Sequence, residues 1–337
     1  MLNAAIIGLG VGERHIEGYE ATGRCKVTAL CDIDKDKLAE VSARNPGRHL
    51  TNSPDDILQD TSIDVVSIAS YDNDHHTQIM MAIDNKKHIF VEKPLCLHDS
   101  EFNDIARKLK ENPDIKLSSN LILRRTHRFL ALKKRIDQGE FGSIYYMEGD
   151  YNYGRLHKIT EGWRGQIPFY SVVHGGAIHL IDLILWLRGG RVREVSAFGN
   201  QIATKDTDFH FNDFVAALLR FEDGSIAKIT ANFGCVFPHY HNLSIYGRKC
   251  SFVHGAHGAN YYHTRDPKVA PEGIDDIYPG TQKGDVIPSF VAHILDGSKP
   301  EVDSADVLEA MAVSLAIENS IKTGGTVSVE YAGTVCR

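Results

Sequence analysis

Three glycines near the N-terminus and an aspartate further along have the spacing of a dinucleotide-binding loop. A short apolar run leads into Gly8, Gly10 and Gly12, and a second apolar run ends on Asp32 some 20 residues later. Glycines let the backbone approach a pyrophosphate, the helix N-terminus after them offers free N–H donors, and the aspartate can accept from a ribose diol. The pattern predicts a bound nicotinamide dinucleotide, whose chemistry is hydride transfer.

One residue of this loop departs from the usual motif. Glu13 stands where a third glycine is expected, and a carboxylate aimed at a pyrophosphate would repel it. Either the loop is one residue shorter and Gly12 takes the third role, or Glu13 faces away; the remaining alternative is an ordinary glycine-rich turn after a buried strand. Ile33 follows Asp32 and offers no charge for a 2′-phosphate, so we expect NAD rather than NADP.

A lysine at the end of another apolar run is a candidate for alcohol chemistry. Oxidising a secondary alcohol needs a hydride acceptor and a base for the hydroxyl proton. Lys93 lies between Glu92 and Pro94, and partial desolvation at a strand end lowers a lysine pKa. Pro94 restricts the backbone before it and holds Lys93 in place. The alternative is a lysine that only solvates the strand end.

A histidine and an aspartate share one helix face further along the chain. His179 begins an apolar, helix-like segment and Asp182 follows three residues later, which places both on the same face. Imidazole titrates near neutral pH and suits reversible proton transfer. Asp182 could fix the ring tautomer or bind a substrate hydroxyl. The alternative is that both residues only cap and stabilise the helix.

The elements that must position these residues change character near residue 120. Before it, short continuous apolar runs alternate with helix-like segments, as in a doubly wound parallel sheet of the α/β Rossmann class. The helix that starts at Ser53 has proline at its first position and acidic residues in its first turn. We expect strands at residues 3–9, 27–32, 65–69, 88–92 and 116–120, with helices at 35–44, 75–85 and 99–112.

After residue 120, period-two alternation marks half-buried antiparallel strands. It predicts an α+β domain with a large, mostly antiparallel open sheet. We therefore expect a dinucleotide-binding domain over residues 1–120 and a substrate-binding and oligomerisation domain over 121–337, with the helix near 304–323 returning to the first domain. The expected strands are 144–153, 192–200, 213–221, 225–233, 240–246 and 326–331, and the helices are 128–138, 179–187, 285–295 and 304–323.

Composition narrows the class of protein. The 337 residues suffice for two domains, and a net charge of −7 argues against general nucleic-acid binding. Without a membrane-length apolar run or a basic leader before the first strand, we expect no membrane span and no secretion. The cysteines show no C-x-x-C pair, so we expect reduced thiols in the cytoplasm: Cys25, Cys31, Cys96, Cys235, Cys250 and Cys336.

The order of the motifs resembles the glucose–fructose oxidoreductase / inositol dehydrogenase / MocA family. The resemblance rests on Val91-Glu92-Lys93-Pro94 and His179-Leu180-Ile181-Asp182, with Gly139-Glu140-Phe141-Gly142 and Tyr246-Gly247-Arg248-Lys249 in matching order. It implies an NAD-dependent oxidoreductase acting on a secondary alcohol or ketone of a sugar, cyclitol or nucleotide-linked sugar. It further implies that Lys93 contacts the reacting hydroxyl, that His179 accepts its proton, and that nicotinamide and substrate share a crevice between the domains.

The resemblance also supplies the wider set of expected contacts. His76 aligns with a family histidine near the cofactor, or else is only a helix-start residue. Cofactor contacts are expected from Gly8, Gly10, Val11, Gly12, Asp32, Ser70, His76, Glu92 and Lys93. Substrate contacts are expected from Lys93, Arg124, Tyr151, Arg164, His174, His179 and Asp182, with Tyr153, Arg155 and Trp163 as further aromatic and cationic candidates.

One departure from the family keeps other functions open. Many relatives carry an aspartate four residues before the histidine, where this chain has Gly175, and His174 could replace that polar group. The alternatives are an NAD-dependent glycosidase of the same family or a non-catalytic NAD-binding sensor.

Two further expectations concern metals and subunits. His239 and His241 share a strand face, but no companion ligand spacing supports a metal site, so we expect none. The large sheet has too little helix to cover both faces, so we expect a homodimer or homotetramer formed through it.

Overall fold

Two units, each built around its own sheet, make up residues 1–332, the part of the chain that the computed structural model describes. The first unit combines Met1–Arg125 with Thr281–Leu308, and the second combines Thr126–Gly280 with Glu309–Tyr331. Neither unit is continuous in sequence, because the segment before the last long helix belongs to the first. Cys336 lies outside the described residues.

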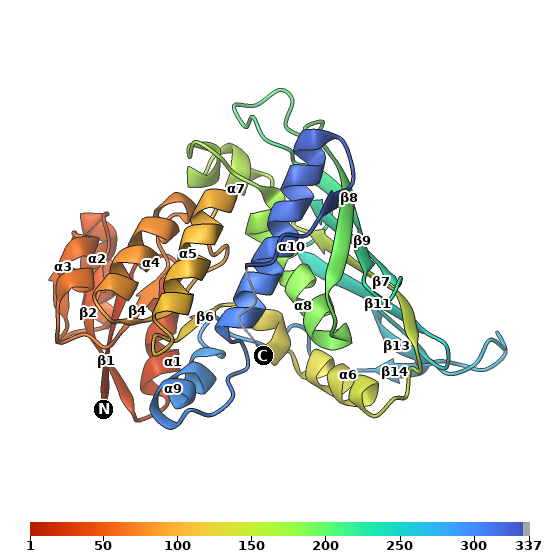
Figure 1. Cartoon of the computed structure of the whole chain (residues 1–337), viewed down its shortest axis with the longest axis horizontal. Helices are drawn as coiled ribbons and strands as arrows, with labels where there is room; N and C mark the ends of the chain where they lie inside the picture. The colour runs from red at the N-terminus through yellow and green to blue at the C-terminus, as the bar shows by residue number, and fades with distance from the viewer. Residues whose placement is uncertain (333–337) are drawn as a thin grey trace. The chain divides into compact units, whose positions relative to one another are not determined.

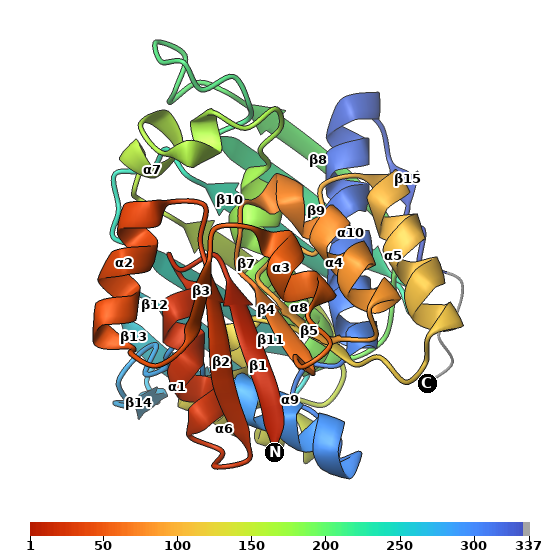
Figure 2. The same ribbon diagram turned by 90° about the vertical axis from the view of Figure 1, so that its left-hand side faces the viewer.

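The first unit contains a six-stranded parallel sheet in the order β3-β2-β1-β4-β5-β6. This order confirms the doubly wound sheet, because the chain crosses over next to β1 as dinucleotide-binding folds do. Figure 2 shows β3, β2, β1 and β4 as neighbours in this sheet. The strands are β1 Leu2–Ile7, β2 Cys25–Cys31, β3 His49–Thr51, β4 Val65–Ile68, β5 His88–Val91 and β6 Leu117–Ser119.

Local signals in the sequence set the helices of this unit. Asp34 caps α2 by accepting from Asp36 N and Lys37 N, and Pro54 is the first residue of α3. The helices are α1 His15–Glu20, α2 Lys35–Arg44, α3 Pro54–Gln59, α4 His75–Asp84, α5 Asp99–Glu111 and α9 Ile287–Asp296, with 3₁₀ turns at Gly12–Arg14, Asp72–Asp74 and Ile122–Arg125.

The second unit contains a nine-stranded sheet in the order β14-β13-β12-β11-β7-β10-β9-β8-β15. Every pair is antiparallel except β10 with β7, which confirms the mostly antiparallel sheet. The strands are β7 Ile144–Asn152, β8 Val192–Asn200, β9 Phe214–Phe221, β10 Ile226–Asn232, β11 Tyr240–Gly247, β12 Ser251–Gly255, β13 Gly258–Tyr262, β14 Glu272–Ile274 and β15 Val327–Ser328.

Helices pack on one face of this sheet. Figure 1 shows α8 and the later part of α10 along that face, and Ser320 of α10 accepts a hydrogen bond from Ala197 N of β8 at 2.9 Å. A π-helical turn at Val173–Ala177 leads directly into α8. The helices are α6 His127–Asp137, α7 His157–Thr160, α8 Ile178–Arg188 and α10 Ser304–Thr323, with a 3₁₀ turn at Trp163–Gly165. Across residues 1–332, none of the helices has the length and apolar character needed to cross a membrane.

Candidate functional site

The glycine loop at the end of β1 fits a dinucleotide. Gly8 has a φ of +86°, and a Cβ there would lie 2.2 Å from the Ala69 carbonyl oxygen after β4. A Cβ on Gly12 would come within 2.8 Å of Ile6 Cγ2, so this glycine lets the turn pack closely on β1. Gly10 is exposed, with nothing within 4 Å of its ideal Cβ. The loop therefore presents bare backbone where a pyrophosphate would bind.

The sequence left open whether Gly12 replaces the third motif glycine or Glu13 faces away from the loop. In the structure both are the case. Gly12 takes the close-packing role of the third glycine. Glu13 turns to α2, where its two oxygens accept from Arg44 Nε and Nη2 at 2.9 Å each. The hydrogen bond from Arg44 lowers the pKa of Glu13, so its carboxylate is matched by a guanidinium rather than turned on the loop.

Asp32 holds the glycine loop from the end of β2. Its Oδ2 accepts from Leu9 N at 2.7 Å, and its Oδ1 accepts from Asp34 N at 2.9 Å. The side chain is half-buried, and Ile33 beside it is exposed. An aspartate at this strand end can accept from the adenosine ribose of NAD.

The residues after β4 and β5 lie together at the carboxyl ends of these strands. His75 Nδ1 donates to Pro94 O at 2.7 Å, and His75 Nε2 lies 3.3 Å from Ser70 O. Ser70 Oγ in turn donates to Gln78 at 2.8 Å. Lys93 is half-buried and joins Pro94 through a cis peptide bond. His75 therefore links the Ser70 turn to the segment that carries Lys93.

His76 lies against α5, and its expected contact with the cofactor stays a prediction. Its Nε2 faces Asp104 of α5 at 3.8 Å, because one residue along a helix turns the side chain by about 100°. His75 is the histidine beside the strand ends, and it was not among the expected site residues. The two histidines are adjacent and of the same type, so the sequence does not indicate which of them contacts the strand ends.

A buried network fixes Glu92, the residue before Lys93. Glu92 Oε1 accepts from Asn120 Nδ2 at 2.7 Å and lies 3.2 Å from His15 Nε2. His15 Nδ1 lies 2.7 Å from Ser67 Oγ. Burial opposes ionisation of Glu92, but the hydrogen bond from His15 and the charges of two lysines outweigh it and lower the pKa. Glu92 is thus a carboxylate that anchors the end of β5.

Arg124 packs within the first unit. It is buried, its Nη1 donates to Glu301 O at 2.9 Å, and it lies 3.0 Å from Asp306 Oδ2. These contacts fix the 3₁₀ turn after β6 to residues 301–306 within the first unit. Its guanidinium serves this packing, and the expected contact of Arg124 with substrate stays a prediction.

In the second unit, His179 lies among aromatic rings on the helix-bearing side of the sheet. Its ring centroid is 6.4 Å from those of Tyr151 and His241. Tyr151 also contacts His239, whose Nε2 lies 3.2 Å from the phenol oxygen. His179 and Asp182 are both buried and three residues apart in α8. The predicted pair of imidazole and carboxylate therefore shares one helix with a wall of rings beside it.

Arg164 lies close to this ring cluster. Burial raises the pKa of Tyr151, and the charges of Arg164 and Arg155 oppose that rise, so both guanidinium groups act on the phenol. Arg155 lies over the Tyr153 ring at 5.6 Å, and Arg164 over the Trp163 ring at 4.6 Å. The structure thus brings together the expected aromatic and cationic candidates of the second unit.

Tyr170 occupies the space that a side chain at Gly175 would need. A Cβ on Gly175 would lie 2.1 Å from the Tyr170 phenol oxygen. Gly175 precedes His179 by about one helical turn, so this phenol lies on the His179 side of the segment. His174 is buried with its ring centroid 6.3 Å from that of Phe169. Tyr170 is therefore a polar group of this region that the sequence did not single out.

Two of the histidines lie just before and within β11. His239 and His241 have ring centroids 4.9 Å apart, and His241 Nδ1 lies 2.8 Å from the Tyr278 hydroxyl. Throughout residues 1–332, no group of three histidine, cysteine or acidic side chains could hold a metal ion.

Comparisons with known proteins match both units. Residues 2–120 match the model of the oxidoreductase family with an NAD-binding Rossmann fold, and residues 129–253 match the GFO/IDH/MocA C-terminal domain. The myo-inositol 2-dehydrogenase of Thermotoga maritima is 21% identical, with 98% of this chain and 99% of the relative covered. The scyllo-inositol 2-dehydrogenase (NAD(+)) of Bacillus subtilis is 25% identical, with 98% and 96% covered.

A solved structure shows the same fold along the whole chain. Levoglucosan dehydrogenase in complex with NADH and L-sorbose superposes with a TM-score of 0.86 at 21% identity, covering 99% of this chain and 100% of that one. With the glycine loop, Asp32 and both family models in agreement, this chain is an NAD-dependent oxidoreductase of the GFO/IDH/MocA family.

Proposed function

We propose that this protein is an NAD-dependent dehydrogenase of a secondary hydroxyl on a sugar, cyclitol or sugar derivative. The observation that carries the proposal is the placement of Lys93, which directly follows the buried carboxylate of Glu92 at the end of β5 in the NAD-binding unit. The named dehydrogenases of inositols among its relatives support the substrate class.

Lys93 binds the hydroxyl that reacts. When bound, NAD⁺ accepts the hydride of the carbon that carries this hydroxyl. Glu92, fixed by Asn120 and His15, sets the backbone position from which the lysine side chain extends. The ammonium donates to the hydroxyl oxygen and stabilises the negative charge that develops there as the proton leaves.

His179 accepts the hydroxyl proton. Imidazole is a general base suited to reversible proton transfer, and Asp182 on the same helix face orients the ring and stabilises the imidazolium that results. Tyr151 covers one side of this region, which limits the access of water.

The substitution Lys93→Met tests this proposal. It removes the ammonium at similar side-chain length, so we expect NADH formation from sugars and inositols to fall by at least about a thousandfold. We expect NAD affinity, measured by calorimetry, to change less than threefold, because the glycine loop and Asp32 are untouched.

Lys110→Met on the exposed face of α5 is the matched control, and it should behave as wild type. Near wild-type turnover in Lys93→Met would contradict the catalytic assignment. Cleavage of a glycoside without net NADH would instead identify an NAD-dependent glycosidase, and NAD binding without turnover on any polyol would identify a sensor.

We also propose a homo-oligomer formed through the outer face of the nine-stranded sheet. Phe198, Leu218 and Ile226 are 75%, 53% and 40% exposed there, on three neighbouring strands.

The cytoplasm is our proposed compartment, because the cysteines among residues 1–332 are free thiols and thiols persist in reducing compartments.

A further inference from the structure

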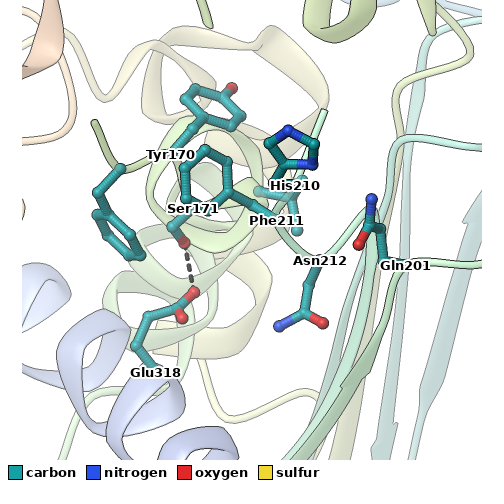
Figure 3. A pocket seen from close by; sticks show the side chains of 9 residues that line it. Tyr170, Ser171, Gln201, His210, Phe211, Asn212 and Glu318 are labelled. Carbon is teal, nitrogen blue, oxygen red and sulfur yellow. Dashed lines mark hydrogen bonds between the residues drawn. The ribbon is translucent and has the colours of Figure 1, made fainter. Parts of the chain in front are cut away.

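A cavity of about 210 Å³ lies within the second unit. It lies beside residues 169–172, which lead into the π-helical turn. The rest of its lining comes from residues 201 and 210–212 and from Glu318 of α10. Figure 3 shows Ser171 and Glu318 on the left of the cavity and Gln201 and Asn212 on the right. Its volume corresponds to roughly seven water molecules, which is room for one monosaccharide-sized ring.

Glu318 of α10 supplies the carboxyl group of the cavity. Ser171 Oγ accepts from Val173 N and His174 N at 3.1 Å each, so its own proton is directed to Glu318, with which it forms a short hydrogen bond. Burial raises the pKa of Glu318, and this hydrogen bond opposes the rise. Within residues 1–332 Ser171 is the one hydrogen-bond partner of this carboxyl, which leaves acceptor capacity directed at a ligand.

The opposite side of the cavity carries two amides. Gln201 Nε2 donates to Phe209 O, which leaves its amide oxygen as an acceptor. Asn212 is half-buried, and no residue of 1–332 hydrogen-bonds its side chain. A Cβ on Gly199 would lie 2.7 Å from Asn212 Cγ, so the close approach of that glycine backbone holds the amide in place.

Aromatic rings complete the lining. Phe169 and Phe211 have ring centroids 5.7 Å apart and stand nearly perpendicular, at 81°. Such rings cover the C–H faces of a sugar or cyclitol, while carboxyl and amide groups hydrogen-bond its hydroxyls. Among the lining residues, all of them described, there is no lysine or arginine.

Tyr170 lies both in the cavity lining and beside Gly175. This tyrosine lines the cavity, and its phenol oxygen fills the space beside Gly175, about one turn before His179. A ligand in the cavity would therefore lie near the helix that carries the proposed proton acceptor.

We propose that this cavity is a binding subsite for an uncharged polyhydroxylated ring, a neutral sugar or cyclitol, and that Glu318 excludes sugar acids. The inference rests on the proposed function and specifies its substrate class. The carboxylate of a uronic acid would face Glu318 with no lysine or arginine in the lining to offset the repulsion. Arg164 and Arg155 are not among the lining residues and belong to the Tyr151 and Trp163 ring cluster.

The test measures the binding of matched sugar pairs by calorimetry in the presence of saturating NADH. The probes are myo-inositol, glucose and galactose against glucuronate and galacturonate, which differ from the two hexoses only at the terminal carbon. We expect wild type to bind at least one neutral probe about tenfold or more tightly than either uronate. Asn212→Ala should weaken the neutral probes about tenfold, as loss of a hydrogen bond to a ligand does.

Glu318→Gln should reduce the preference for neutral probes by weakening the exclusion of the uronates. Glu309→Gln is the matched control, since it lies on the same helix and outside the cavity lining. Thermal unfolding of each variant confirms that it folds, and Asn212→Ala alone decides the matter if Glu318→Gln does not. Equal or tighter uronate binding by wild type, unchanged neutral affinities in Asn212→Ala, or no neutral probe bound at all would overturn the proposal.

The outcome is separable from that of the proposed function. If wild type forms NADH from a neutral polyol whose KM is unchanged in the cavity variants, the subsite is wrong and the dehydrogenase stands. If neutral polyols bind in a variant-dependent way but never yield NADH, the subsite stands and the dehydrogenase is wrong.

Discussion

Two residues that depart from the expected motifs are each explained by one neighbouring side chain. Glu13 replaces a motif glycine and is matched by Arg44. Gly175 replaces a family aspartate and leaves its space to the Tyr170 phenol. In both cases the unusual residue is accommodated by a specific neighbour, so the motif position taken alone gives a misleading interpretation of the site.

The buried carboxylate of Glu92 should make the stability of the fold depend on pH. Its pKa in the folded protein is lower than the usual 4.5, so the carboxylate stabilises the fold above that value, and this contribution is lost as pH falls through the folded pKa. We expect Glu92→Gln to lower the free energy of unfolding by about 2 kcal/mol at pH 7. The difference from wild type should shrink as pH falls below about 4.5.

Denaturant unfolding of both proteins from pH 7 down to pH 3 measures this difference. A destabilisation that stays constant over the whole range would show that the charge of Glu92 does not contribute. Glu101→Gln serves as a control for a carboxylate that caps a helix, since Glu101 accepts from Leu97 N and His98 N on α5.

The sequence predicted a residue's place in the structure well where a motif requires one residue type. It did so only partly where two neighbouring residues of the same type could each occupy that place. Gly8, Gly12 and Asp32 follow from spacing, because backbone approach and a strand-end carboxylate require those types. His75 and His76 are adjacent and identical in type, so the contact of His75 with Pro94 had no signal in the sequence. Arg124 looked available for a ligand because its partners Glu301 and Asp306 lie far along the chain.

Among the helices and strands, long and strongly patterned segments were predicted, whereas the short strands β3, β12, β13 and β14 were not. Helices α2 and α10 and strand β8 begin and end where the pattern places them. Strand β3 has two exposed residues of three, so neither an apolar run nor alternation marks it. Strands β12, β13 and β14 form one end of the large sheet, and their pairing comes from the neighbouring strand rather than from their own composition.

The loop between β1 and α1 allows stability and cofactor binding to be separated. Gly8→Ala would place a Cβ 2.2 Å from Ala69 O at a φ of +86°, so we expect a loss of at least about 2 kcal/mol of unfolding free energy. Gly10 has open space around its Cβ position, so Gly10→Ala should change stability by less than about 0.5 kcal/mol.

Calorimetric titration with NAD then measures the effect of Gly10→Ala on cofactor binding. A methyl group at residue 10 would obstruct the approach of a pyrophosphate to the backbone, so we expect Gly10→Ala to bind NAD at least about tenfold more weakly. Unchanged NAD affinity in this folded variant would place the pyrophosphate elsewhere.

At the scale of the whole molecule, the outer face of the nine-stranded sheet predicts self-association. Exposed apolar side chains on neighbouring strands mark an interaction surface, and a two-fold pairing of identical surfaces is the commonest outcome. We expect light scattering to give at least twice the mass of the 337-residue chain at micromolar concentration. Leu218→Glu, in the middle of this face, should lower the mass to that of one chain.

Val269→Glu provides the control, since Val269 is 56% exposed in the loop between β13 and β14 and not on β8, β9 or β10, and it should leave the mass unchanged. A wild-type monomer at micromolar concentration would contradict the proposed oligomer without affecting the dehydrogenase.

We propose that this molecule oxidises a sugar or cyclitol hydroxyl with NAD. The most direct measurement follows the absorbance of reduced nicotinamide when the purified protein and NAD meet a panel of inositols, neutral sugars, sugar acids and nucleotide-linked sugars. We predict steady growth of that absorbance with at least one neutral polyol, and its loss in Lys93→Met. Absence of the signal with every member of the panel, by a protein that calorimetry shows to bind NAD, would contradict the account.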